Sequence, residues 1–167
     1  MTEDERREAF ERLMDGYGTA LYRMCCLQLR DRALAEDAVQ DTFLKAFKAL
    51  GDFRRESSER TWLMRIAINT CRDYLRSGWF RRVDRRITPD DLKEEGEEKP
   101  LPDDEVPRAV MALPRDFREV VLLRYYQNLN VRETAGVLRV SEATVKRRLK
   151  AANNKLRLSL GGWYFNE

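Results

Sequence analysis

Histidine is absent from this chain of 167 residues. Its absence excludes imidazole metal ligands and the Ser-His-Asp and Cys-His arrangements of nucleophilic catalysis. Cysteine is scarce, and Cys25, Cys26 and Cys71 lack the spacing of a zinc finger, so we expect buried free thiols in a reducing cytosol. A glycine-rich phosphate-binding loop is also missing. The sequence therefore predicts a protein that is not an enzyme and that holds no metal and no cofactor.

Long hydrophobic runs are missing as well. The longest run drawn from Val, Ile, Leu, Met and Phe covers residues 120–123, which is far shorter than the ~20 residues of a membrane-spanning helix. The N-terminus, MTEDERREAF, is too highly charged for a signal peptide. We therefore expect a cytoplasmic protein without direct membrane insertion.

The net charge of +3 is distributed unevenly along the chain. Residues 1–82 include 16 basic and 14 acidic residues. Residues 83–105 include 4 basic and 10 acidic residues, and residues 106–167 include 12 basic and 5 acidic residues. Because the outer blocks show helical periodicity, we predict an all-α protein with two small helical domains, 1–82 and 106–167, joined by an acidic flexible linker at 83–105. The basic excess of the last block suits nucleic acid.

The linker contains three prolines, the acidic run EEGEE and few apolar residues, so it cannot bury enough surface to fold alone. Two interpretations remain open. The linker is either a solvated tether or a segment whose negative charge mimics nucleic acid inside a positively charged channel.

The strongest pattern lies at residues 130–158, NVRETAGVLRVSEATVKRRLKAANNKLRL. Asn130 and Glu133 have the spacing of a capping box, a break follows at 139–140, and Ser141 caps a longer second helix. The apolar stripe of that second helix consists of Val145, Leu149, Ala152 and Leu156. A short helix, a tight turn and a second helix with a basic outer face favour a DNA-binding helix-turn-helix over a surface helix with merely solvated charges.

Periodicity predicts six further helices, at residues 2–12, 17–30, 35–50, 61–77, 106–113 and 115–127, the last with Tyr125 facing inward. The outer face of 35–50 is charged, which on composition alone indicates an ordinary solvated surface. Helix 61–77 carries an arginine-rich side, and two interpretations are equally open: contact with a splayed single strand, or a surface over a tryptophan core. Trp62 and Tyr74 taken individually favour the core.

Three stretches in this order resemble a known family: AEDAVQDTFLKAF, FRRESSERTWLMRIAINTCRDYLR and LPRDFREVVLLRYYQNLNVRETAGVLRVSEATVKRRLKAANNKL. Together they resemble the small alternative sigma factors of bacterial RNA polymerase, of the extracytoplasmic-function (ECF) type within the sigma-70 family. The resemblance implies that residues 1–82 bind core RNA polymerase and melt and read the −10 element, and that residues 106–167 bind the −35 element of promoter DNA. It also implies an anti-sigma factor as a partner, which in this family is often membrane-anchored, and a role in stress responses.

The resemblance carries specific residues with it. The clamp-docking helix of the family implies a core-binding set of Glu36, Asp37, Gln40, Asp41 and Lys45. The loop and helix that pocket a flipped base imply −10 contacts from Arg54, Arg55, Ser57, Ser58, Thr61, Trp62, Arg65, Asn69, Arg72 and Arg76. The helix-turn-helix implies −35 contacts from Arg132, Ser141, Glu142, Thr144, Lys146, Arg147, Arg148 and Lys150.

The chain departs from the family in the turn, where Arg139 stands in place of a frequent glycine, which leaves the turn geometry open. The rival interpretation is a stand-alone helix-turn-helix regulator that acts without polymerase. It accounts for residues 106–167 but not for the acidic helix 35–50 or for helix 61–77. A purely structural helical adaptor would leave the basic C-terminal block without a role.

Overall fold

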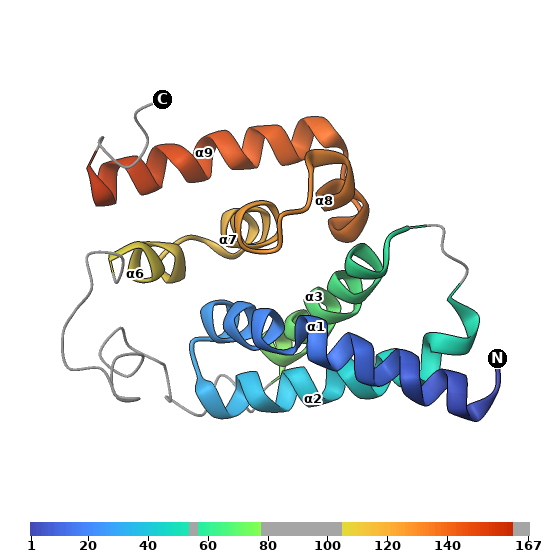
Figure 1. Cartoon of the computed structure of the whole chain (residues 1–167). Coiled ribbons are helices and arrows are strands. Elements are labelled where there is room, and N and C mark those ends of the chain that lie inside the picture. The colour runs from blue at the N-terminus through green and yellow to red at the C-terminus, as the bar shows by residue number, and fades with distance from the viewer. Residues whose placement is uncertain (54–56, 78–104, 162–167) are drawn as a thin grey trace. The chain divides into compact units, whose positions relative to one another are not determined.

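The computed structural model describes residues 1–53, 57–77 and 105–161, and every regular element in those ranges is helical. The all-α architecture predicted from the sequence is therefore confirmed. The chain separates into two compact units, Met1–Asp84 and Arg85–Glu167 (Figure 1). Of the predicted linker 83–105, all but Glu105 lies outside the described residues. None of the helices in the described ranges combines the length and the apolar content needed to cross a bilayer.

Helix α1 runs unbroken through Glu3–Leu29, so the prediction of two helices at 2–12 and 17–30 was wrong. Gly16 and Gly18 lie inside α1, and each costs about 1 kcal/mol relative to alanine in a helix interior. Burial along the whole length of the helix outweighs that local cost. The largest fully buried side chains of α1 include Leu13, Leu21, Met24 and Leu29.

Two more helices complete the N-terminal unit. Helix α2, Arg32–Ala49, begins after Asp31, whose carboxylate accepts the Leu34 N–H at 3.0 Å, and it leads into a 3₁₀ turn, Leu50–Asp52. Helix α3, Glu59–Arg76, begins after Ser58, whose hydroxyl accepts the Thr61 N–H at 3.1 Å. Helix α1 packs against both α2 and α3, which also pack against each other, so the three helices enclose one core.

Arg6 of α1 closes the C-terminal end of α2. Its Nε and Nη2 atoms donate to the Phe47 carbonyl at 3.0 and 2.8 Å, and the guanidinium carbon lies 4.5 Å from the centroid of the Phe47 ring. The last carbonyls of a helix lack partners within the helix, and a cation suits that negative end. Arg6 therefore fixes the N-terminal half of α1 to the end of α2.

The three cysteines are buried free thiols, as the sequence predicted. Cys25 of α1 and Cys71 of α3 lie with their Sγ atoms 3.6 Å apart. The hydrogen bond with Cys71, together with burial, raises the pKa of Cys25 well above its ordinary value. Because the thiolate is the reactive form of cysteine, this thiol contributes to packing and not to chemistry.

The C-terminal unit is built around its last helix. It contains α6, Glu105–Met111; α7, Arg115–Val121; a π-helical segment, Leu122–Tyr126; α8, Val131–Leu138; and α9, Glu142–Leu160. Helix α9 packs against α6, α7 and α8, as Figure 1 shows. The predicted stripe on α9 is confirmed: Val145, Leu149, Ala152 and Leu156 are all buried, and Leu160 extends it.

The π-helical segment changes which side chains face the core. A π turn holds more residues than an α turn, so the side chains after Val121 depart from α-helical spacing. Leu122 and Leu123 are fully buried, whereas Tyr125 is 49% exposed, so the prediction that Tyr125 faces inward was wrong. Its hydroxyl instead accepts a hydrogen bond from Nδ2 of Asn153 on α9 at 3.1 Å.

Candidate nucleic-acid interface

Two caps and one left-handed residue set the geometry of the helix-turn-helix. Asn130 and Glu133 form a reciprocal capping box, with N–H to side-chain oxygen distances of 2.8 and 3.0 Å. Arg139 ends α8 in the left-handed conformation, with φ 58° and ψ 46°. Ser141 then starts α9 by accepting the Thr144 N–H at 3.1 Å. The turn that the sequence left open is therefore held by a non-glycine residue.

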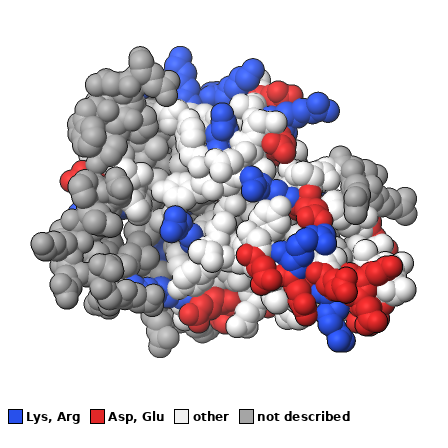
Figure 2. Space-filling view, in the orientation of Figure 1, with Lys and Arg blue, Asp and Glu red and all other residues white. Residues whose placement is uncertain are grey.

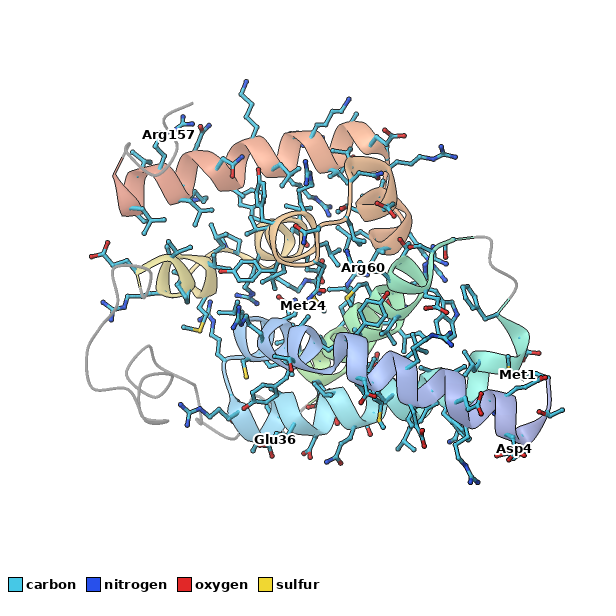
Figure 3. The ribbon with its side chains drawn as sticks, viewed as in Figure 1. Met1, Asp4, Met24, Glu36, Arg60 and Arg157 are labelled. Atoms are coloured by element: carbon cyan, nitrogen blue, oxygen red, sulfur yellow. The ribbon has the colours of Figure 1, made fainter. Side chains whose placement is uncertain are left out.

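Basic side chains gather on the outer face of α9. Figure 2 shows Lys and Arg along the edge of the C-terminal unit that α9 forms, and Figure 3 shows Arg157 projecting from α9 on the side opposite α6 and α7. Of the residues predicted for the −35 contact, the exposed ones are Arg132, Ser141, Glu142, Lys146, Arg147 and Lys150. Thr144 and Arg148 are half-buried, and Arg148 Nη2 lies 3.8 Å from Oδ2 of Asp116 on α7. Arg148 is thus already engaged within its own unit.

The residues predicted for the −10 contact lie in α3 and in the segment before it, and their environments differ. Arg54 and Arg55 lie outside the described residues, and Ser58 is the helix cap. Thr61 is buried, whereas Asn69 and Arg76 are exposed. The others, Ser57, Trp62, Arg65 and Arg72, are half-buried. On α3 the exposed residues of this set are Asn69 and Arg76, and Arg76 is paired with Asp73 on the same helix.

Trp62 stacks on a neighbour within the protein. Its ring lies 4.7 Å from that of Phe53, centroid to centroid, at an interplanar angle of 22°. Parallel aromatic rings at this separation attract each other beyond the area they bury. Trp62 therefore uses one ring face to join the end of the 3₁₀ turn to the first turn of α3.

Helix α1 also holds the first turn of α3, a relation that sequence reasoning missed. Arg12 Nη2 lies 2.9 Å from Glu59 Oε1, and the Arg60 guanidinium lies 5.6 Å from the centroid of the Tyr17 ring. The two partners of each pair are more than forty residues apart in the sequence, so no local spacing signals the contact. They place the start of α3 relative to α1.

The acidic face of α2 is open to solvent in the described structure. Glu36, Asp37, Gln40 and Lys45 are exposed and Asp41 is half-buried. Figure 3 shows Glu36 on the side of α2 that faces away from α1. Spacings of three and four residues place Asp37, Gln40 and Asp41 on one side of the helix.

A polar network joins this face to α3. The Tyr74 hydroxyl donates to Oδ2 of Asp41. Lys45 Nζ donates to the Thr70 hydroxyl at 3.1 Å and lies 3.8 Å from Oδ2 of Asp73. Burial and the hydrogen bond to Asp41 raise the pKa of Tyr74 well above its ordinary value, so the hydroxyl remains a donor at neutral pH. A groove of about 480 Å³ runs between the two helices at this point.

Comparison with known proteins gives consistent matches over both units. A family model described as Sigma-70 region 2 matches residues 8–81, and one described as Sigma-70, region 4 matches residues 103–156. The chain is 30% identical over 164 residues to the RNA polymerase sigma-H factor of Pseudomonas aeruginosa, covering 90% of this chain and 85% of the relative. It is 32% identical over 157 residues to the ECF RNA polymerase sigma factor SigM of Mycobacterium tuberculosis, covering 93% and 79%.

Two solved structures share the fold. CnrH, in complex with the cytosolic domain of CnrY, is 29% identical with a TM-score of 0.71, covering 92% of this chain and 88% of that one. The sigma factor RpoE, in complex with the anti-sigma factor NepR from Bartonella quintana, is 23% identical with a TM-score of 0.75, covering 93% and 99%. Because the family models and the relatives agree over most of the length, the chain belongs to the ECF type of the sigma-70 family, whose members direct promoter-specific transcription initiation by RNA polymerase.

Proposed function

We propose that the two units divide the work of a sigma factor between polymerase and promoter. Residues 1–82 bind core RNA polymerase through α2 and engage the −10 strand through α3 and the segment before it. Residues 106–167 bind the −35 duplex, and residues 83–105 connect the two activities. The protein acts in the cytoplasm as an initiation factor, not as an enzyme.

The observation that carries this proposal is the geometry of α8 and α9. A capped helix, a left-handed turn and a second capped helix give the arrangement in which the second helix enters the major groove. Lys146, Arg147 and Lys150 are exposed in the first half of α9, where such a helix meets phosphates and base edges. The buried stripe on the opposite side holds the helix to its own unit.

The −10 contact is assigned to the exposed side of α3. Asn69 carries both donor and acceptor groups for the edge of an unpaired base, and Arg76 suits a phosphate. Opening a base pair costs a few kcal/mol. Polymerase binding offsets this cost when the same chain holds both polymerase and the −10 strand. Trp62 supports this surface through its stack on Phe53.

A regulatory partner follows from the relatives. The structures of CnrH and RpoE are complexes with the cytosolic domain of CnrY and with the anti-sigma factor NepR. We infer that an anti-sigma factor likewise binds this chain and competes with core polymerase. The charged outer faces of α2 and α9 are the surfaces such a competitor would have to block.

Run-off transcription tests the proposal. Purified core polymerase is incubated with a pool of promoter fragments, with and without the protein. Discrete start sites that require both components are expected, and they define the −35 and −10 elements together. If no start site appears but the protein alone shifts specific duplexes, it is a stand-alone regulator and the proposal fails.

A further inference from the structure

We propose that Tyr74 is a positioning residue for polymerase binding, which acts by holding the Asp41 carboxylate in place on the docking face of α2. This inference rests on the proposed function, because it assumes that the α2 face contacts core polymerase. Neither Tyr74 nor any other group of the network on α3 belongs to the set of core-binding residues inferred from the sequence.

The geometry places Tyr74 where it can control one side chain of that face. Asp41 is half-buried, whereas Glu36, Asp37 and Gln40 on the same helix are exposed. The Tyr74 hydroxyl reaches across from α3 and donates to Oδ2 of Asp41. A carboxylate has two oxygens with about four acceptor sites, so this hydrogen bond fixes the side chain and still leaves acceptor capacity for a partner.

Side chains of α3 also hold Lys45 in place. Its ammonium group donates to the Thr70 hydroxyl at 3.1 Å and lies 3.8 Å from the Asp73 carboxylate. Asp41 and Lys45 are one helical turn apart, so they form adjacent groups of opposite charge on one face. Tyr74, Thr70 and Asp73 thus hold two of the five docking residues from a second helix.

Holding these side chains lowers the entropy that binding must remove. An exposed side chain loses conformational entropy when it is immobilised at an interface, and a side chain already fixed by a hydrogen bond avoids much of that cost. The groove of about 480 Å³ beside the network keeps Asp41 accessible to a basic group of the partner. Tyr74 therefore increases affinity without touching polymerase.

The test is a double-mutant cycle on the full chain, with binding to purified bacterial core RNA polymerase measured by biolayer interferometry. Tyr74→Phe removes only the hydroxyl and is expected to weaken binding about two- to tenfold, the range for immobilising one side chain at an interface. Asp41→Ala, which removes the acceptor of that hydrogen bond, is expected to weaken binding at least as much. Because Tyr74 acts through Asp41, adding Tyr74→Phe to Asp41→Ala is expected to change the affinity by less than about twofold.

Tyr17→Phe is the matched control, since it removes a hydroxyl in the same unit from a ring that contacts Arg60 of α3. It is expected to leave the affinity unchanged, and melting curves of all variants establish that each is folded. The inference is overturned if Tyr74→Phe binds like the wild type, if Asp41→Ala does, or if the two effects add fully. A wild-type chain that fails to bind core polymerase contradicts the proposed function itself, which separates the two failures.

Discussion

At the scale of single residues, Arg139 holds a conformation that glycine adopts more readily. Its φ of 58° lies in the left-handed region, where a residue with a Cβ costs about 1–2 kcal/mol. We therefore expect Arg139→Gly to stabilise the helix-turn-helix by about 1 kcal/mol and Arg139→Val to destabilise it, because a β-branched side chain is poorly accommodated there. Amide hydrogen exchange of residues 131–160 measures both changes. Equal exchange in the two variants would contradict the strain at this turn.

A second prediction concerns the ionisation of Tyr74. Burial and the Asp41 carboxylate raise its pKa above the ordinary tyrosine value of about 10. The hydrogen bond from Tyr74 to Asp41 therefore stabilises the fold fully below the ordinary tyrosine pKa, and this stabilisation is lost as the pH rises through the raised pKa of Tyr74. Among the described residues, Asp37, Lys45, Cys71 and Asp73 also lie close to it.

Ultraviolet absorbance of the phenolate form tests this ionisation. We expect Tyr74→Phe to remove a component that titrates later than the ordinary tyrosines, so the curves of wild type and variant diverge only at the alkaline end. A curve that loses amplitude uniformly near pH 10 would show that Tyr74 ionises as an ordinary tyrosine.

At the scale of the element, α9 exposes Lys146, Arg147 and Lys150 in its first half and Lys155 and Arg157 in its second half. We expect Lys146→Ala combined with Arg147→Ala to weaken binding to a −35 duplex and to lower the slope of log affinity against log salt by about two units, roughly one for each lost phosphate contact. The control is Lys155→Ala with Arg157→Ala, which removes equal charge from the far end of the same helix. If the two double variants have identical salt slopes, the first turns of α9 are not the part of the helix that contacts DNA.

The helix-turn-helix shows which features of an element can be predicted from sequence. Its capping box, its break at Arg139 and its apolar stripe depend on neighbours within four residues, so the sequence predicted all of them and the structure agrees. The continuity of α1 could not be predicted, because tertiary burial overrides the local cost of Gly16. The exposure of Tyr125 could not either, because a π-helical turn alters the α-helical spacing.

The candidate sites show the same limit. The charged face of α2 follows from helical spacing alone, and its exposure agrees with the prediction. The pairs Tyr74–Asp41 and Arg12–Glu59 join residues more than thirty positions apart, and no periodic pattern connects them. The sequence therefore predicted which side of α2 is exposed, whereas the residues that hold its side chains in place emerged only from the packing of α1, α2 and α3.

At the scale of the whole molecule, two separate compact units imply that the two activities can be lost independently. We expect Asp41→Arg to abolish binding to core polymerase, because it reverses a charge on the docking face, while binding to a −35 duplex at low salt is retained. Lys146→Ala with Arg147→Ala is expected to retain polymerase binding and to lose promoter selection. A pull-down with core polymerase and a duplex titration measure the two activities side by side.

A mixture of these two variants is the more demanding test. Polymerase binding and −35 recognition must reside in one chain, because only a connected chain brings the second contact to a high effective concentration once the first has formed. The variant that binds polymerase lacks the promoter contact, and the variant that binds the duplex cannot join it. We therefore expect the mixture to remain inactive in run-off transcription. Start sites restored by mixing would mean that the two units function without their covalent connection, and the role assigned to residues 83–105 would be wrong.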